Sequence, residues 1–320
     1  MTSRAGTTPA IVLVVVGLAC QEVGAALAVV LFPQVGPLGM VMLRLVFSAI
    51  LLLLIARPGL RGHSRSGWLA VLGFGVVLAV MNGLFYLALA RLPLGVTVTI
   101  EVLGPLVLSI VASRRRSAWL WALVALAGVL ALGGGGWERL DPIGVLFALG
   151  AAASWAFYIL ASARVGREFP RLDGLALAMT VGALIALPFG IASAGAALLR
   201  PDLLALGAAV AVLSSTIPYA LELIALRRLA ASAFAILMSL APATAALAGW
   251  LLLGQELVWL EILGIALVIV ASIGAVRSAS TVAMRSAGEA PADAAPPAAV
   301  DEKVGEPGPE LDEPFAEPVA

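Results

Sequence analysis

The sequence has little charge: only 12% of its 320 residues are Asp, Glu, Lys or Arg, whereas 62% are hydrophobic. A water-soluble domain carries about 25% charged residues, so a soluble enzyme is excluded. The single cysteine, Cys20, rules out an intrachain disulfide and a cysteine-based zinc cluster. The single histidine, His63, lies in a basic loop, which argues against a His-built metal or catalytic centre. We therefore expect neither a metal nor a cofactor.

Enzyme signatures are also missing. The chain contains no HExxH, GxSxG or GxxxxGK[ST] motif. No segment combines basic and aromatic residues in a way that would project into water, so nucleic-acid binding has no support. The composition and the missing motifs together favour a membrane protein without enzymatic activity.

Apolar runs dominate the chain, and a run of roughly 17–25 residues is long enough to span a bilayer as a helix. We count ten such runs, the fifth of which is short and ends in the glycine run 133–136. They lie at about Ala10–Phe32, Leu38–Ala56, Gly67–Ala90, Leu94–Ala112, Ala118–Leu132, Pro142–Ala163, Gly174–Leu198, Leu203–Ala225, Ser232–Leu253 and Trp259–Val276. The predicted fold is an all-α integral membrane protein with ten transmembrane helices and only short connections.

Basic residues are unequally divided between the loops on the two sides of these helices. If the N-terminus is cytoplasmic, twelve arginines fall on the cytoplasmic side and only Arg91, Arg139 and Arg200 on the other. Short loops rich in Lys and Arg stay in the cytoplasm. We therefore expect a multi-pass protein of the cell inner membrane with both termini in the cytoplasm.

The composition changes after the last apolar run. Residues 286–320 hold nine acidic residues and one lysine and are rich in Ala and Pro. Such a segment has too little apolar surface to offset its ordering entropy. Residues 278–320 are predicted to form a disordered acidic cytoplasmic tail.

An internal repeat relates the two halves of the apolar region. Alignment of Asn82–Leu106 with Tyr219–Ala243 places Arg91 over Arg228 and Pro105 over Pro242. The pairing predicts two five-helix repeats, residues 1–136 and 137–277. Because each repeat has an odd number of helices, the second must be inverted relative to the first, an architecture typical of alternating-access transporters.

Four charged residues lie within the predicted helices: Glu22, Arg44, Glu101 and Glu222. A charge at the bilayer centre costs roughly 2.5–3.5 kcal/mol, so each should face a cavity or a partner. Arg44 and Glu101 fall at a similar depth, which leaves two interpretations open: a structural ion pair, or contact of Glu101 with substrate or a proton. Glu222 lies near the cytoplasmic end, where solvent could reach it.

Uncharged polar residues accompany these charges at helical spacing. Asn82 and Tyr86 are four residues apart and share a helix face, as do Thr97 and Glu101. Pro105 leaves the carbonyl of Glu101 without its helix partner, and a half-broken helix beside a carboxylate is typical of transporter sites.

The second half offers a comparable polar stripe. Thr216, Tyr219 and Glu222 follow one another at intervals of three residues in the predicted eighth helix, which places them along one face.

Several strings resemble the bacterial threonine/homoserine exporters of the EamA-type drug/metabolite transporter superfamily. They are MNGLFYLALARLPLGVTVTIEVLGPLVLSIVASRR (Met81–Arg115), LSSTIPYALELIALRRL (Leu213–Leu229) and FAILMSLAPATAALAGWLLLGQEL (Phe234–Leu257). The resemblance covers roughly Ala10–Val276 and implies ten helices, both termini inside, and efflux of small amino acids driven by the proton gradient. Members often carry Gln at the position of Glu22, and Gln255 replaces their usual Glu.

The predicted function is export of small neutral amino acids such as threonine and homoserine by proton antiport. Glu101 would bind the substrate ammonium group or the coupling proton, and Arg44 would orient Glu101 or bind the substrate carboxylate. The predicted substrate-binding residues are Glu101, Asn82, Tyr86, Arg44, Thr216, Tyr219, Glu22 and Glu222. The alternatives are a drug or metabolite exporter of the same fold, a passive channel, and an intramembrane acid/base enzyme that uses Glu22 and Glu101.

Overall fold

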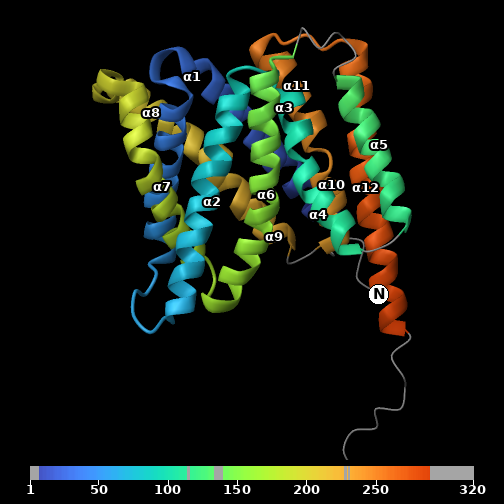
Figure 1. The fold of residues 1–320 in the computed structure, drawn as a ribbon. Coiled ribbons are helices and arrows are strands. Elements are labelled where there is room, and N and C mark those ends of the chain that lie inside the picture. Colours follow the sequence, from blue (N-terminus) through green and yellow to red (C-terminus); the bar gives the residue numbers. More distant parts are fainter. Residues whose placement is uncertain (1–6, 114–115, 133–139, 227–228, 230, 289–320) are drawn as a thin grey trace, which may run out of the picture. The chain divides into compact units, whose positions relative to one another are not determined.

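The computed structural model describes residues 7–113, 116–132, 140–226, 229 and 231–288. Within these ranges all regular structure is helical, which confirms the predicted all-α class. The elements are α1 (Thr7–Ala56), α2 (Arg65–Leu89), α3 (Leu94–Glu101), α4 (Leu103–Ser113), α5 (Arg116–Leu132), α6 (Pro142–Glu168), α7 (Asp173–Ala194), η4 (Gly195–Leu199), α8 (Pro201–Ala211), η5 (Val212–Thr216), α9 (Ile217–Leu226), α10 (Ala231–Met238), α11 (Ala241–Leu253) and α12 (Trp259–Gly288). The chain divides into two units, Met1–Val282 and Ala283–Ala320, and the first unit contains α1 to α11 and most of α12 (Figure 1).

Many of these helices are apolar on all sides, as helices within a bilayer are. Among the described residues, seven helical segments are long and apolar enough to cross a membrane, and two shorter apolar helices cover Trp119–Leu132 and Pro201–Thr216. Large side chains such as Trp119, Leu146 and Phe157 remain more than 60% exposed in the isolated protein. The chain is therefore a multi-pass membrane protein whose outer surface is suited to lipid.

The longest helix, α1, is broken near its middle. Gly36 has φ 71° and ψ 164°, so α1 consists of two helical arms on either side of it. Positive φ favours glycine, and a Cβ at this position would clash with the Oγ of Ser193. The same hydroxyl donates to the carbonyl of Val35 at 3.2 Å. The two arms correspond to the first two predicted spans.

Three other predicted spans are also interrupted. The fourth is broken at Val102 between α3 and α4, and the ninth at Ser239 and Leu240 between α10 and α11. The eighth contains the π-helical turn η5, which ends directly before Ile217 and Pro218. Each break lies one to three residues before a proline, because proline cannot donate to the carbonyl four residues earlier.

The first and second halves of the chain carry their helices at matching positions. In the alignment that pairs Asn82 with Tyr219, α3 coincides to the residue with α10, and α4 begins one residue before α11. The same alignment places α2 over the run α8–η5–α9, and the two arms of α1 over α6 and α7. The break at Val102 falls on Ser239, so the irregularities match as well as the helices.

The last helix is longer than predicted. α12 continues to Gly288, twelve residues beyond the predicted end of the tenth span at Val276. Residues 277–288 contain no proline and include Ala, Met and Arg, which are strong helix formers. The remainder of the predicted acidic tail, residues 289–320, lies outside the described residues.

Candidate functional site

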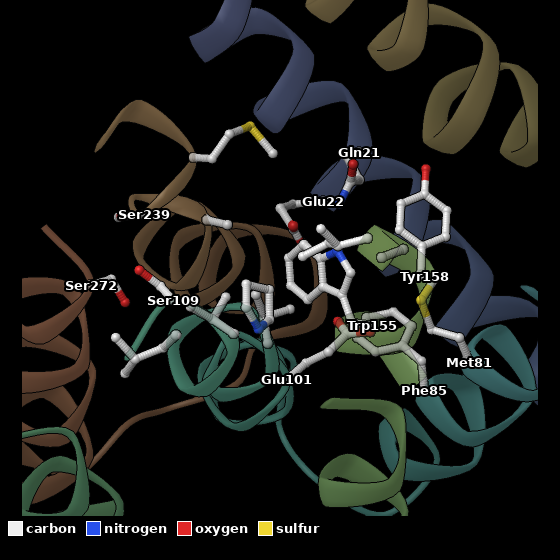
Figure 2. Close-up of a pocket in the computed structure, with 18 of the residues that line it drawn as sticks. Gln21, Glu22, Met81, Phe85, Glu101, Ser109, Trp155, Tyr158, Ser239 and Ser272 are labelled. Atoms are coloured by element: carbon white, nitrogen blue, oxygen red, sulfur yellow. The ribbon is translucent and has the colours of Figure 1, made fainter. Parts of the chain in front are cut away.

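A cavity of about 470 Å³ lies inside the helical unit. Small-molecule sites typically measure about 300–1,000 Å³, so the cavity has room for a metabolite. Helices from both halves of the chain contribute to it. Its lining comprises Gln21, Glu22, Ala25, Arg44, Met81, Asn82, Phe85, Val98, Glu101, Val102, Pro105, Leu106, Ser109, Trp155, Tyr158, Ile159, Phe234, Met238, Ser239, Ala241, Ser272, Ala275 and Val276 (Figure 2).

Four of the eight predicted site residues meet in this lining: Glu22, Arg44, Asn82 and Glu101. They come from the two arms of α1, from α2 and from the last residue of α3. The first arm of α1 and the end of α3 are far apart in the sequence, so the fold assembles this set. Among the described residues, no group of three or more His, Cys, Asp or Glu side chains could hold a metal ion.

The two carboxylates give the cavity its acidic character. Glu22 is only 2% exposed, and its Oε2 has no hydrogen-bond partner among the described residues. Glu101 is half-buried and ends α3, where the helix dipole disfavours negative charge. The two carboxylates interact electrostatically with each other and with Arg44. A buried charge is costly unless paired, so this part of the cavity is suited to a cation or a proton.

Arg44 links the first half of the chain to the second. Its Nη2 donates to the carbonyl of Ser214 at 3.1 Å, and its Nε donates to the Oγ of Ser215 at 3.3 Å. Both serines belong to η5, and π-helical turns are frequent at functional sites. Within the first half, Arg44 contacts Tyr86, whose hydroxyl accepts from Nη1 at 3.4 Å and whose ring centroid lies 5.6 Å from the guanidinium carbon.

The uncharged residues predicted for the site differ in whether they line the cavity. Asn82 lines the cavity and donates from Nδ2 to the carbonyl of Leu78 at 2.8 Å, which leaves its Oδ1 to accept. Tyr86 is fully buried beneath Arg44 and is not part of the lining. The Oγ1 of Thr216 is buried without a partner among the described residues, also away from the lining. The side chains of Tyr219 and Glu222 lie outside the described residues.

Sequence reasoning missed most of the uncharged lining. Trp155 and Tyr158 are three residues apart on α6 and form an aromatic wall with Phe85, and their i, i+3 spacing was the available signal. Ser109, Ser239 and Ser272 come from three distant segments and carry no shared pattern.

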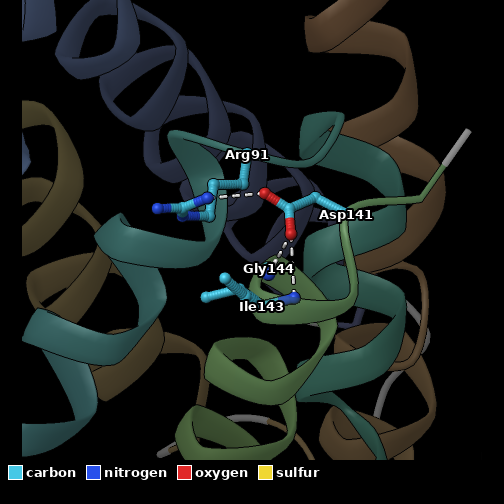
Figure 3. Close-up of polar contacts among 4 residues, drawn as sticks. All are labelled: Arg91, Asp141, Ile143 and Gly144. Carbon is cyan, nitrogen blue, oxygen red and sulfur yellow. Dashed lines mark hydrogen bonds and ion pairs between the residues drawn. The ribbon is translucent and has the colours of Figure 1, made fainter.

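Away from the cavity, an ion pair joins the two halves at the turn that follows α2. The Nη1 of Arg91 and the Oδ2 of Asp141 are 2.6 Å apart (Figure 3). Asp141 also caps α6, since its Oδ1 accepts from the amides of Ile143 and Gly144. The hydrogen bond from Arg91 and the amide of Ile143 lower the pKa of Asp141 below its usual value.

Many membrane transporters are multi-pass helical units with an internal cavity that holds a few charged residues, and this chain has both features. Residues 142–277 match the EamA-like transporter family. The chain is 39% identical to the threonine/homoserine exporter RhtA of Escherichia coli (strain K12) over 266 residues, which cover 82% of this chain and 90% of that protein. It is 38% identical to the RhtA exporter of Salmonella typhimurium (strain LT2) with the same coverage. The chain belongs to the EamA-like transporter family.

The family assignment confirms the resemblance drawn from the sequence and the prediction of a transporter rather than an enzyme. A solved crystal structure of a protein at 22% identity has a TM-score of 0.55 and covers 87% of this chain and 99% of its own. At this identity the likeness shows the fold alone.

Proposed function

We propose that this protein exports small neutral α-amino acids, threonine and homoserine first, across the inner membrane by proton antiport. The observation that carries the proposal is the meeting of Glu22, Glu101 and Arg44 at one cavity in a chain 39% identical to threonine/homoserine exporters. An α-amino acid has an ammonium and a carboxylate group on one carbon. A cavity with two carboxylates and one guanidinium offers a complementary partner to each.

Each charged residue has a proposed role that follows from its position. Glu101 binds the substrate ammonium group in one state and a proton in the other. Arg44 binds the substrate carboxylate and compensates the negative charge of the cavity. Glu22, whose Oε2 has no partner among the described residues, shares the ammonium group or the proton with Glu101. Asn82 offers the substrate its Oδ1 as an acceptor.

The remaining predicted residues have indirect roles. Tyr86 supports Arg44 from below through its hydroxyl and ring. Thr216 lies in η5, the turn that contacts Arg44, and Tyr219 and Glu222 follow it in α9. We expect substitutions in this group to change transport less than substitution of Glu101.

We further propose that the chain crosses the membrane ten times, as two inverted five-helix repeats, residues 1–136 and 137–277. The ten crossings are the two arms of α1, then α2, α3–α4, α5, α6, α7, α8–η5–α9, α10–α11 and α12. The helices and breaks that coincide when Asn82 is aligned with Tyr219 support the repeat. The two repeats meet at the cavity, which is the arrangement that alternating access requires.

Transport in proteoliposomes tests the function. Protein purified with its full chain and reconstituted into vesicles loaded with radiolabelled threonine should release it faster when an inward proton gradient is imposed. Glu101→Gln keeps the shape and hydrogen bonding of the side chain but removes its titration, so it should abolish the response to the gradient. Glu256→Gln, at an exposed carboxylate beyond α11, is the matched control and should behave like the parent.

Two outcomes would contradict the proposal. Threonine release that is independent of the proton gradient in the parental protein would indicate a passive channel. Release of unrelated drugs in preference to amino acids would indicate an exporter of the same fold with another substrate.

The orientation is tested by labelling a single cysteine. The distribution of arginines favours a cytoplasmic position for the loop between α1 and α2. In a background without Cys20, Ser64→Cys should be protected from an impermeant thiol reagent in intact cells and labelled after lysis. Labelling in intact cells would reverse the proposed topology.

A further inference from the structure

The cavity has two chemically different ends. Figure 2 shows the aromatic side chains Phe85, Trp155 and Tyr158 on one side and three serines, Ser109, Ser239 and Ser272, on the other. In this view Glu22 and Glu101 lie next to Trp155, at the aromatic side of the cavity. Glu22, Glu101 and Arg44 already provide partners for the ammonium and carboxylate groups of the substrate. The three serines therefore need another explanation.

The serines reach this end from three elements. Ser109 lies on α4, Ser239 in the turn after α10, and Ser272 on α12. Leu106 and Ile110 of α4 pack in one cluster with Ala271 and Ala275 of α12. The neighbours of Ser109 therefore face the neighbours of Ser272, so the two hydroxyls belong to facing helices at one boundary of the cavity.

Ser272 differs from most helical serines described, and unlike Ser48, whose buried Oγ also has no partner among the described residues, it lines the cavity. Ser154 and Ser214 satisfy their hydroxyls by donating to the carbonyl four residues earlier, at 2.8 and 2.6 Å. The side chain of Ser272 is buried, at 6% exposure, yet its Oγ has no hydrogen-bond partner among the described residues. A buried hydroxyl without a partner is unfavourable. Because Ser272 lines the cavity, a ligand in the cavity can supply the partner.

We infer that Ser109, Ser239 and Ser272 form a hydroxyl subsite that binds the side-chain hydroxyl of the substrate and selects hydroxy-amino acids. A hydroxyl has one donor and two acceptor positions, so a substrate hydroxyl can donate to one serine and accept from another. This inference rests on the proposed function, because it requires the α-ammonium and α-carboxylate groups of the substrate to bind at Glu22, Glu101 and Arg44.

The subsite accounts for discrimination between isosteric amino acids. Valine has the shape of threonine but a methyl group in place of the hydroxyl, and norvaline is related to homoserine in the same way. A purely apolar pocket separates such pairs weakly, whereas a site built around hydrogen bonds rejects the analogue that leaves its polar groups unpaired. The serines thus recognise the side-chain hydroxyl of the substrate, while the charged residues recognise its ammonium and carboxylate groups.

Competition in proteoliposomes tests the subsite. The exchange of radiolabelled threonine by the reconstituted full chain is measured with unlabelled threonine, valine, homoserine or norvaline as competitor. Ser272→Ala should lower the preference for threonine over valine by about 3- to 10-fold, the effect of one lost hydrogen bond. The triple variant Ser109→Ala/Ser239→Ala/Ser272→Ala should accept valine and threonine about equally. Ser154→Ala, outside the lining, should keep the parental preference.

The outcomes separate this inference from the function on which it rests. Parental protein that exchanges no threonine would overturn both. Parental protein that exchanges threonine, together with a triple variant that exchanges it with an unchanged preference over valine, would overturn the subsite alone. If the triple variant lost all exchange, the single variant Ser272→Ala would provide the test. An unchanged preference of Ser272→Ala for threonine over valine would also overturn the subsite.

Discussion

The two halves of the chain share a helical pattern but contribute different chemistry to the cavity. The alignment of the halves places Glu22 over Ile159 and Glu101 over Met238, and all four line the cavity. Arg44 falls on Val181 in the same way. The first half supplies the charged groups, and the second supplies apolar side chains at the corresponding positions.

This difference shows that two halves with matching helix positions need not produce a symmetric site. A charge inside the membrane is costly, whichever half contains it. One cluster of carboxylates and a single guanidinium is sufficient to recognise an amino acid, so a second set would add cost without adding recognition. The second half instead positions Arg44 through η5 and lines the cavity with Trp155 and Tyr158.

The largest expected effect on threonine transport comes from substitution at Glu101, compared with its matched position Met238 in the second half. Glu101→Gln should lower threonine exchange about 10- to 100-fold, since a hydrogen bond to a charged group contributes about 1.5–3 kcal/mol. Met238→Leu conserves volume and should remain close to the parent. Both are measured by exchange in proteoliposomes, with size-exclusion profiles as the folding control. Equal effects at the two positions would contradict the functional asymmetry of the halves.

The next effect concerns the link between the halves at Arg44. Lysine keeps the charge but cannot reproduce the guanidinium contacts with Ser214 and Ser215. We expect Arg44→Lys to reduce exchange about tenfold, in line with the loss of one or two hydrogen bonds, although the charge of the cavity is unchanged. Arg164→Lys, at an exposed arginine that contacts Ser66, is the control. Parental exchange by Arg44→Lys would show that charge alone matters.

A smaller effect, on stability, is expected when a methyl group is added at a closely packed position where the two halves differ in residue size. Gly104 in the first half corresponds to Ala241 in the second, and a Cβ at Gly104 would overlap the carbonyl oxygen of Ala152. Gly104→Ala should therefore destabilise the protein by about 1–3 kcal/mol. Gly83→Ala, where no atom beyond the neighbouring residues and backbone of its own helix would lie within 4 Å of the new Cβ, should be neutral or stabilising. Thermal unfolding in detergent measures both, and a Gly104→Ala variant as stable as the parent would contradict the close α4–α6 contact.

The smallest effect is expected at the exposed ion pair between the halves, Arg91–Asp141. Asparagine can still cap α6, so Asp141→Asn removes only the charge and should leave exchange near the parental rate. The folded-state pKa of Asp141 is lowered, so its stabilising contribution is present above the unfolded pKa of about 3.9 and is lost as the pH falls through the folded-state value. The stability difference between variant and parent should thus narrow on acidification. A difference that widened at low pH would contradict this assignment.

Much of the architecture followed from local composition. A membrane helix requires about twenty apolar residues, and this requirement acts on each segment separately, so the runs could be read from the chain one at a time. The two arms of α1, the positions of α2, α6 and α7, and the half-broken helix at Glu101 all correspond to features of the sequence. Charged and polar residues within apolar runs are equally visible, which is why Glu22, Arg44, Asn82 and Glu101 were among the eight predicted site residues.

The composition of the cavity wall was decided by the tertiary structure. Ser272, Ser109 and Trp155 are ordinary residues of apolar helices, and only contacts between distant segments place them around one space. The contact of Arg44 with η5 joins the two halves of the sequence and depends on a π-helical turn that no spacing of apolar residues encodes. Sequence alone determined which segments are apolar enough to enter a membrane and where the costly charges lie, because hydrophobicity is a local property. The partners of those charges were determined by packing, which depends on the whole chain.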